Sequence, residues 1–319
     1  MRYKQPMSLV KRNYLQKKSD VKSWLYYLNK IRRYGIRNTY KSIKLNHQNK
    51  HFKYELGIVA IIKNEAPYLR EWIEFHRLVG VEVFYLFDNE STDNTKEVLE
   101  QYISQGIVKY TFAKGNGQQI PIYNKTFSFC RNEVRWLAII DADEFLVPIN
   151  HKTILEMLDS VSGSFSQLLV GWLIYGSNGY KSKPNGLVIE NFKYHADLDF
   201  MADYKPIINP RLAVNMTFPH WVNVIGKTVD ENGRRIWGYP FITKNYALPS
   251  SKNKIRINHY YSKSLEEFLT KSKRGYADYV GSDRSIRDMD AFKEHDQNSV
   301  TDNVMDTYID ELKVRENIE

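Results

Sequence analysis

Hydrophobic and polar stretches alternate regularly between residues 55 and 140. Apolar, β-rich runs at 55–62, 81–87, 107–112 and 136–140 predict strands, and the five apolar residues of the last run indicate a buried one. The segments between these runs carry apolar residues at helical spacing and predict helices at 67–79, 95–103 and 123–133. This alternation predicts an α/β fold, with a parallel or mixed sheet covered by helices on both faces.

Polar side chains follow three of these strands. Ligands of such sheets bind outside the carboxyl ends of the strands, so we expect the three polar sets to line one crevice. Neither GxGxxG after the first strand nor GxxxxGK[ST] is present, which argues against a dinucleotide fingerprint and a P-loop. The polar sets are Lys63, Asn64 and Glu65, then Asp88 and Asn89, and finally Asp141, Asp143 and Glu144.

The acidic turn after the fourth strand predicts a metal site. Asp141 and Asp143 lie two residues apart with the small Ala142 between them. Carboxylates at the end of a buried strand are costly to hold without a counter-charge, and hard oxygen ligands suit Mn²⁺ or Mg²⁺. The alternative is that these acids cap a helix or face solvent. The buried strand before the turn and the apolar residues 145–147 after it favour the metal, with Asp143 as the firmer ligand.

The second half of the chain predicts shorter elements. These are a helix at 153–158, a strand at 165–172, a strand or short helix at 187–194, extended segments at 205–210 and 212–214, and a strand at 255–261. Asn232-Gly233 predicts a hairpin, and Ser264 with Glu267 predicts a capping box for a helix at 265–273. We therefore expect a catalytic domain at 54–283, in halves 54–150 and 151–283, and a charged tail at 284–319.

The first 53 residues differ from the rest in charge. They contain fifteen Lys or Arg and one acid, so this arm has a net charge of +14. The net charge of the whole chain is +9, so the remaining 266 residues have a net charge of −5. Trp24, Leu25, Leu28 and Ile31 lie near helical spacing among basic residues, as in helices that lie in an anionic membrane interface. A solvated extension or a helix packed on another subunit is the alternative. No recognised binding module accompanies the charge, which disfavours nucleic acid.

Three other features of the sequence bear on the cellular location of the protein. No apolar run approaches the roughly 20 residues that span a bilayer, and the basic N-terminus lacks the apolar region of a secretory signal. The single cysteine, Cys130, excludes an intrachain disulfide. We expect a cytoplasmic protein, peripheral to the inner face of the cytoplasmic membrane if the arm binds lipid.

Several motifs resemble one enzyme family. The Ala60–Glu65 strand end, the Asp88-Asn89-x-Ser91-x-Asp93 turn and the Asp141–Phe145 segment resemble nucleotide-sugar glycosyltransferases of the GT-A fold, in the glycosyltransferase 2 or family 92-like group. Further similar segments lie at 172–179, 183–190 and 258–275, so the resemblance covers roughly residues 54–280. It implies a GT-A-like, Rossmann-type mixed sheet and an inverting, metal-dependent transfer of a hexose from a UDP-sugar to a glycan.

The resemblance also implies roles for particular residues. His259 corresponds to a third metal ligand, and Asp88 to an acid that accepts hydrogen bonds from the uracil or ribose of the donor. Lys263 and Arg274 are expected beside the donor diphosphate. For each of these, helix packing, capping or a solvated surface is the alternative. The other candidates for the donor site are Lys63, Asn64, Glu65, Gln119, Asn124, Arg131, Asp141 and Ala142.

Inversion requires a carboxylate that deprotonates the acceptor hydroxyl. The carboxylates in the expected acceptor region are Glu190, Asp197, Asp199 and Asp203. We expect the base to be Asp197 or Asp199, and next Glu190. Sugars stack on aromatic faces, and core packing is the alternative for such residues; the candidates for the acceptor site are Trp172, Tyr175, His220 and Trp221.

The leading hypothesis is a UDP-galactose or UDP-glucose transferase that extends lipopolysaccharide or capsule, with a lipid-linked glycan as acceptor. The enzymatic alternative is a nucleotidyltransferase that makes a nucleotide sugar. That class normally has a Gly-rich loop with Arg or Lys after the first strand, whereas this chain has Lys63-Asn64-Glu65-Ala66-Pro67. The non-enzymatic alternative is a glycan-binding scaffold, against which the intact acidic turn argues.

Overall fold

The structure is a computed structural model that describes residues 23–48, 51–198, 200, 203–236, 252–273 and 288–316. The first half of the core alternates strands and helices as the sequence predicts, with boundaries shifted by a few residues. The largest shift is at the third helix, which begins at Gln119 instead of 123. The elements are β1 (Tyr54–Ile62), α4 (Ala66–Leu78), β2 (Val83–Asp88), α5 (Thr95–Ser104), β3 (Val108–Phe112), α6 (Gln119–Cys130) and β4 (Val134–Ile139).

Strand β1 is apolar along its length because both of its faces are covered. Ile58 and Ala60 face the core cluster that contains residues of α4, and Val59 and Ile61 face the cluster that contains residues of α6. Alternate residues of a strand point to opposite faces, so helices cover both sides of the sheet. The predicted α/β class is confirmed.

The large sheet is mixed. Its strands run in the order β12-β11-β6-β8-β4-β1-β2-β3, in which β1, β2, β3 and β4 are mutually parallel. Strand β8 pairs antiparallel with both β4 and β6. The hairpin predicted at Asn232-Gly233 is present, since β11 pairs antiparallel with β12. The bounds are β6 (Gln167–Ile174), β8 (Tyr204–Ile208), β11 (Thr228–Val229) and β12 (Arg235–Ile236).

A strand that we did not predict follows the acidic turn. Strand β5 (Glu144–Pro148) pairs antiparallel with β13 (Ile255–His259), with His259 opposite Glu144. Strand β13 also runs parallel to β6. This pairing carries His259 to the acidic turn from more than a hundred residues away in sequence.

Helix α4 fixes the position of β5. The indole of Trp72 donates a hydrogen bond to the carbonyl oxygen of Glu144 (2.8 Å). The backbone N–H of Leu146 donates to Nε2 of His76 (3.1 Å), and Nδ1 of His76 faces the carbonyl oxygen of Trp72 (2.7 Å). Burial lowers the pKa of His76 to about 3, so its ring is neutral and Nδ1 donates. The acidic turn thus begins a strand that a buried helix holds in place.

The remaining elements of the second half are short. The segment predicted as a strand or a short helix contains both α8 and β7, and the capping box of Ser264 and Glu267 is present at the start of α9. The predicted strands near 205 and 212 correspond to β8 and β9. The bounds are α7 (Ile154–Ser160), α8 (Val188–Asn191), β7 (Tyr194–His195), β9 (Ala213–Phe218), β10 (Trp221–Val224) and α9 (Leu265–Lys273).

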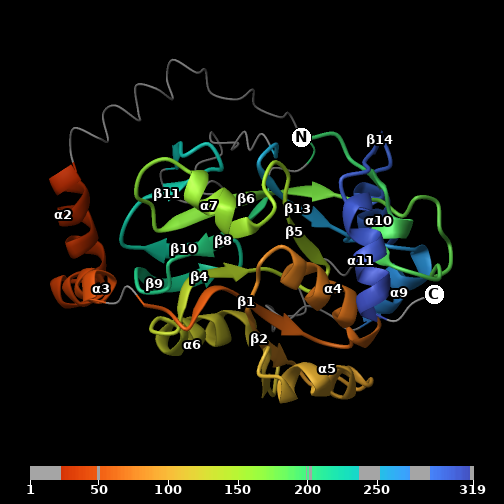
Figure 1. Ribbon diagram of the computed structural model, residues 1–319, viewed down its shortest axis with the longest axis horizontal. Coiled ribbons are helices and arrows are strands. Elements are labelled where there is room, and N and C mark those ends of the chain that lie inside the picture. Colours follow the sequence, from red (N-terminus) through yellow and green to blue (C-terminus); the bar gives the residue numbers. More distant parts are fainter. Residues whose placement is uncertain are drawn as a thin grey trace.

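The C-terminal segment packs on the core. Its elements are α10 (Met289–His295), β14 (Val300–Thr301), which pairs with β7, and α11 (Asp306–Glu316), which lies beside α4 (Figure 1). Leu312 is fully buried, and Asp302 accepts hydrogen bonds from Arg256 and from the hydroxyl of Tyr175. The boundary that we predicted at 284 therefore separates segments that pack together.

The basic arm contains two helices, α2 (Ser23–Tyr34) and α3 (Ile36–Gln48). Gly35 separates them in a left-handed conformation (φ +83°) that favours glycine. The hydroxyl of Tyr34 donates to Asn223 on β10 (3.0 Å), and Asn209 donates to Asn46 on α3 (2.8 Å). Figure 1 shows these helices beside β9 and β10, at the opposite end of the molecule from α9 and α11.

No helix within the described ranges is both long and apolar enough to cross a bilayer.

Candidate functional site

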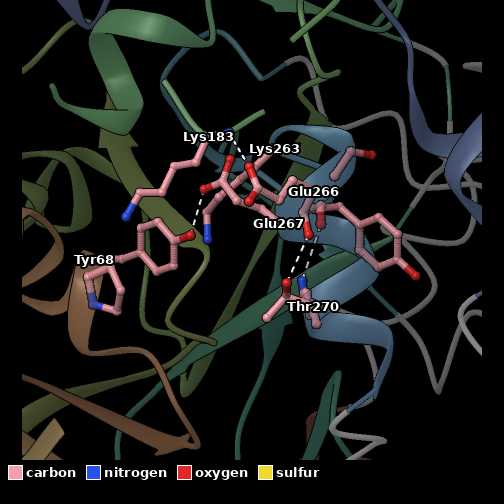
Figure 2. Close-up of a pocket in the computed structure, with 10 residues that line it drawn as sticks. Tyr68, Lys183, Lys263, Glu266, Glu267 and Thr270 are labelled. Carbon is pink, nitrogen blue, oxygen red and sulfur yellow. Dashed lines mark hydrogen bonds between the residues drawn. The ribbon is translucent and has the colours of Figure 1, made fainter. Parts of the chain in front are cut away.

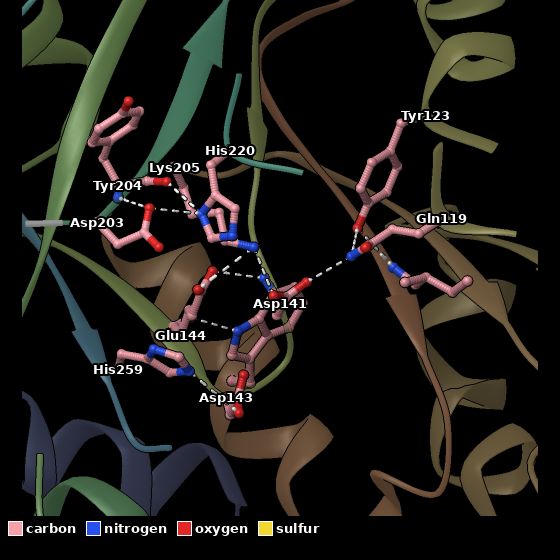
Figure 3. Close-up of polar contacts among 12 residues, drawn as sticks. Gln119, Tyr123, Asp141, Asp143, Glu144, Asp203, Tyr204, Lys205, His220 and His259 are labelled. Atoms are coloured by element: carbon pink, nitrogen blue, oxygen red, sulfur yellow. Dashed lines mark hydrogen bonds and ion pairs between the residues drawn. The ribbon is translucent and has the colours of Figure 1, made fainter. Parts of the chain in front are cut away.

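The two aspartates of the acidic turn face different partners (Figure 3). Oδ2 of Asp141 lies 2.6 Å from Nζ of Lys205, and Gln119 donates to Oδ1 of Asp141 (3.3 Å). Asp143 instead accepts a hydrogen bond from Lys271 on α9, and its Oδ2 lies 3.5 Å from Nε2 of His259. The turn therefore holds two carboxylates, each beside its own lysine.

Lys205 is the buried counter-charge of the turn. It lies on β8, is 2% exposed, and its Nζ is 3.6 Å from Glu144 as well as close to Asp141. Burial alone would lower the pKa of Lys205, but the Asp141 and Glu144 carboxylates raise this pKa above its usual range. Burial raises the pKa of Glu144, whose Oε2 accepts a hydrogen bond from the backbone of Asp141.

Asp143 is ionised and His259 is neutral. Burial alone would raise the pKa of Asp143, but the Lys271 ammonium and the His259 ring hold it well below its usual range. Burial lowers the pKa of His259, and the Asp143 carboxylate opposes this only in part. An ionised carboxylate beside a neutral imidazole is a donor set that divalent cations bind.

The geometry fits part of the predicted metal site. Oδ2 of Asp143 and Nε2 of His259 lie 3.5 Å apart, so this carboxylate oxygen and this imidazole nitrogen could serve one divalent cation together. Asp143 and His259 are therefore the residues that would hold a cation. Asp141 is turned toward Lys205, and among the described residues no three His, Cys, Asp or Glu side chains are grouped to hold a metal. The three-ligand set stays a prediction.

A pocket of about 230 Å³ opens between the start of α4 and helix α9 (Figure 2), and Lys271 in its wall pairs with Asp143. Its wall includes Lys183, Lys263 and Lys271. The ammonium groups of Lys183 and Lys263 lie over the ring of Tyr68, at 4.8 and 3.5 Å from its centre. The pocket is therefore lined by three cations next to the candidate metal ligands.

The two glutamates of this pocket make hydrogen bonds within the protein. Glu267 accepts from the hydroxyl of Tyr68 (2.6 Å) and caps α9 through Ser264. Glu266 accepts from the backbone N–H of Lys183 (2.9 Å). The carboxylates thus shape the pocket and position its lysines.

Residues after β1 and β2 form a second part of the site. The side chain of Asn64 accepts from the backbone of Thr92 (2.7 Å), which joins the two strand ends. Asp88 is buried, and its two oxygens accept from the backbone of Ser91 (2.8 Å) and the hydroxyl of Tyr110 (2.7 Å). Lys63 is half-buried and Glu65 is buried; both lie at the same edge of the sheet.

Several predicted site residues have other roles in the structure. The side-chain amide of Asn124 donates to the carbonyl oxygen of Met216 and accepts from the backbone N–H of the same residue, and so joins α6 to β9. Arg131 follows α6 and bonds to the carbonyl oxygen of Phe127, before β4 begins and hence away from the carboxyl edge of the sheet. Tyr175 is buried and donates to Asp302. These three contacts are structural.

Two of the predicted bases lie outside the cluster around the acidic turn. Glu190 forms an ion pair with Lys313 on α11 (2.6 Å), and Asp197 lies in an exposed turn. Asp199 and Arg274 lie outside the described residues.

Aromatic residues extend the site away from Asp143. The ring of Trp172 lies 4.3 Å from the ring of His259 and 5.0 Å from that of His220. His220 in turn lies 3.2 Å from Asp203. Trp221, which begins β10, is half-buried next to His220. Two of the predicted acceptor residues, Trp172 and His220, therefore form one cluster with the candidate metal ligands.

Two lysines of the site had no predicted role. Lys205 lies in an otherwise apolar strand, and a lone charge in a buried strand indicates a buried partner of opposite charge. Lys271 lies within the segment 258–275 that resembles the family, but it was given no role, because it occupies the last turn of a partly exposed helix, where basic residues are common.

Comparison with known proteins agrees with the resemblance seen in the sequence. A family model described as glycosyltransferase family 92 matches residues 59–312. A glycosyltransferase family 92 protein of Ricinus communis is 25% identical over 235 residues, which cover 71% of this chain and 39% of that protein. Another from Arabidopsis thaliana is 27% identical over 256 residues, 75% of this chain and 40% of that protein. The chain thus matches about two fifths of the length of these relatives.

Solved structures show weaker similarity. S. aureus TarS, also crystallised in complex with UDP, is 16% identical, with a TM-score of 0.35 over 50% of this chain and 48% of that chain. Glucosyl-3-phosphoglycerate synthase of Mycobacterium tuberculosis, crystallised with Mn²⁺ and UDP, is 14% identical, with a TM-score of 0.27 over 42% and 48%. The family model, by contrast, covers most of the chain, and the chain belongs to glycosyltransferase family 92.

Proposed function

We propose that this protein is a glycosyltransferase that moves a sugar, with inversion, from a UDP-sugar to the hydroxyl of a glycan. The observation that carries the proposal is the lysine-lined pocket, whose wall residue Lys271 pairs with Asp143, the carboxylate that faces His259. A nucleotide-sugar donor carries a diphosphate, and a pocket with three ammonium groups next to candidate cation ligands suits that group. Membership of family 92 supports the same activity.

Asp143 and His259 would hold Mn²⁺ or Mg²⁺, with Asp141 as the third predicted ligand. When bound, the cation supplies a Lewis acid that stabilises the negative charge developing on the leaving diphosphate. Lys263 and Lys183 face the same pocket and would bind phosphate oxygens. Lys271, which pairs with Asp143, would add a third positive charge.

The nucleotide would lie along the ends of β1 and β2. Asp88 and Asn64 are fixed there by backbone and tyrosine contacts, and Lys63, Glu65, Gln119 and Ala142 lie nearby at the same edge of the sheet. We propose galactose or glucose as the donor sugar, following the resemblance of the motifs. We propose a glycan of lipopolysaccharide or surface polysaccharide, carried on lipid, as the acceptor.

The donor assignment predicts a measurable stabilisation. UDP with Mn²⁺ should raise the melting temperature of the full chain, because a ligand that binds only the folded state stabilises it by about 2.7 kcal/mol at 100 times its Kd. The same experiment with UDP and EDTA should give a much smaller shift, since the diphosphate would lack its cation. Differential scanning fluorimetry measures both.

A second assay separates the alternative enzymes. A glycosyltransferase hydrolyses its donor slowly in the absence of acceptor, so UDP release from UDP-galactose or UDP-glucose should require Mn²⁺ or Mg²⁺. A nucleotidyltransferase would instead form a nucleotide sugar from UTP and a sugar 1-phosphate. If UDP with Mn²⁺ gives no melting shift and no donor is hydrolysed, the glycan-binding scaffold is left as the function.

The arm presents a basic outer face with exposed apolar side chains. Leu28, Ile36 and Tyr40 are 49%, 70% and 66% exposed, although they are large hydrophobic residues. The exposed basic residues of the two helices are Arg32, Arg33, Arg37, Lys41 and Lys44, and residues 23–48 contain no acid. We propose that this face binds the anionic inner surface of the cytoplasmic membrane, where a lipid-linked acceptor would lie.

The membrane proposal predicts charge-dependent binding to vesicles. Vesicles of phosphatidylcholine and phosphatidylglycerol should bind the full chain, and vesicles of phosphatidylcholine alone should bind it much less. The triple variant Arg37→Glu/Lys41→Glu/Lys44→Glu should bind the anionic vesicles about 100-fold more weakly, because each cation near the surface contributes about 1 kcal/mol. Co-sedimentation measures the bound fraction.

A matched variant controls for net charge. Lys96→Glu/Lys125→Glu/Lys293→Glu makes the same change at exposed lysines of α5, α6 and α10. It should bind the vesicles like the unmodified chain. An equal loss in both triple variants would show that the total charge, and not the arm, drives binding.

A further inference from the structure

The inversion step needs a base, and the structure places one carboxylate in the cluster that contains the candidate metal ligands. Asp203 immediately precedes β8, two residues before Lys205. Figure 3 shows it with His220, beside Lys205 and Glu144 and in the same group of side chains as Asp143 and His259.

One oxygen of Asp203 is fixed. Its Oδ1 accepts a hydrogen bond from the backbone N–H of Tyr204 (2.9 Å) and lies 3.2 Å from Nδ1 of His220. That same Nδ1 lies 2.9 Å from the carbonyl oxygen of Tyr204. The backbone is held too, since the carbonyl oxygen of Asp203 accepts from the N–H of Trp172 on β6 (2.9 Å). The carboxylate is thereby held in one orientation.

The other oxygen of Asp203 is available. Oδ2 accepts no hydrogen bond from the residues that the structure describes, and the side chain is 20% exposed. A general base needs this arrangement, in which one oxygen is anchored and the other can approach the proton that it removes.

Trp172 connects Asp203 to the donor side of the site. Its ring packs against the rings of both His220 and His259. An acceptor sugar that contacts the exposed part of Trp172 would therefore lie between Asp203 and the candidate metal ligands.

We propose that Oδ2 of Asp203 is the base that deprotonates the acceptor hydroxyl, and that His220 is the residue that positions it; this inference rests on the proposed glycosyltransferase function. In the step, the hydroxyl proton passes to Oδ2 as the acceptor oxygen forms a bond to C1 of the donor sugar. The bond from C1 to the β-phosphate oxygen breaks, and its electron pair leaves on UDP.

The surroundings of Asp203 suit this task. Burial raises its pKa to about 6, against the effects of the Tyr204 N–H and the Lys205 ammonium. Among the described residues, the charged or titratable groups beside it include His220, from the segment before β10, and Lys205, two residues further along the chain on β8. A carboxylate with this pKa is ionised at neutral pH and accepts a proton more readily than an ordinary aspartate.

The test removes the carboxylate of Asp203 and then supplies azide, a nucleophile that reacts without a base. Asp203→Asn should reduce Mn²⁺-dependent UDP release from UDP-galactose or UDP-glucose by about 10²–10⁴-fold, the usual contribution of a general base. Sodium azide should restore UDP release, with a glycosyl azide of inverted configuration as the product, because azide carries no proton to be removed. The melting shift with UDP and Mn²⁺ should be unchanged.

Further variants make the result decisive. Asp203→Glu keeps the carboxylate and should retain more activity than Asp203→Asn, whereas Asp310→Asn, at an exposed position on α11, should behave like the unmodified chain. His220→Leu should move the acidic limb of the pH profile of kcat/KM to higher pH, because the carboxylate loses a nearby N–H that favours its ionised form.

The outcomes distinguish failure of the Asp203 assignment from failure of the proposed glycosyltransferase function. If the unmodified chain turns over donor and Asp203→Asn does so equally well, or stays inactive with azide while it still binds UDP and Mn²⁺, Asp203 is not the base. If Asp203→Asn fails to fold, an Asp203→Glu variant that folds but has no activity with or without azide would overturn the assignment. If the unmodified chain turns over no UDP-sugar, the proposed function itself is wrong.

Discussion

Replacing Asp143 with asparagine is expected to lower the turnover of the UDP-sugar donor by about 10²–10³-fold, the loss typical when one group that stabilises a developing charge is removed. Oδ2 of Asp143 lies 3.5 Å from Nε2 of His259, and the ionised carboxylate pairs with Lys271 in the wall of the lysine-lined pocket. The variant should also bind Mn²⁺ more weakly, as measured by isothermal titration calorimetry without donor. UDP release measures the turnover.

Lys271 allows the role of Asp143 in catalysis to be separated from its role in stability. Loss of the Asp143 charge leaves the nearly buried Lys271 without this partner, which should reduce the free energy of unfolding by up to about 3 kcal/mol. The double variant Asp143→Asn/Lys271→Met removes both charges and should recover much of that stability, but not the turnover. Urea denaturation gives the free energies.

The result that would contradict the metal role is full turnover in the double variant, or unchanged Mn²⁺ affinity in the single one. In that case Asp143 would act only as a partner of Lys271. Asp290→Asn is the control for the loss of one carboxylate, because the Asp290 side chain is 88% exposed and lies on α10.

Much of the sheet could be predicted because local pattern and tertiary packing agree there. Strand β1 is apolar along its length, and both of its faces are covered, so its sequence indicates its environment directly. Strand β5 was missed although Phe145, Leu146 and Val147 are apolar. Its neighbour β13 lies more than a hundred residues away, and pairing at that separation leaves no local pattern.

The same reason limited the prediction of the site. Asp141 and Asp143 could be recognised from the sequence because a buried strand precedes them. Which partner each carboxylate would meet depends on β8 and α9, and their packing against the turn cannot be inferred from spacing. The C-terminal segment was predicted as a charged tail, and its packing on the core left no local pattern either. Its sequence is highly charged, but Leu312 and Met305 are buried against the core.

Replacing Lys205 with methionine is expected to have the largest effect on stability. Lys205 is 2% exposed and is shared by Asp141 and Glu144, so its loss leaves two carboxylates without their cation. Removal of one partner from a buried ion pair typically costs about 3–5 kcal/mol. The free energy of unfolding, from urea denaturation at neutral pH, should fall by that amount.

The pH dependence of this loss has a definite sign. Lys205 lowers the pKa of the buried Glu144 carboxylate, so without this lysine the pKa of Glu144 rises further in the folded state, and the folded protein binds more protons than the unfolded one at moderate pH. Stability then falls as pH rises through this range, and the difference from the unmodified chain should be larger at pH 8 than at pH 5. A difference that does not vary with pH would indicate that packing, and not charge, causes the loss.

A double variant and a surface control complete the experiment. Lys205→Met/Asp141→Asn removes the pair together and should be more stable than Lys205→Met alone, with a coupling energy of about 1–3 kcal/mol. Lys293→Met breaks an exposed ion pair with Asp290, in which the two side chains are 71% and 88% exposed, and should change stability by no more than about 0.5 kcal/mol. If both lysine variants lose the same small amount, the Lys205 ammonium does not hold the acidic turn, and the turn must instead be held by its backbone pairing with β13 and by the hydrogen bond from Trp72.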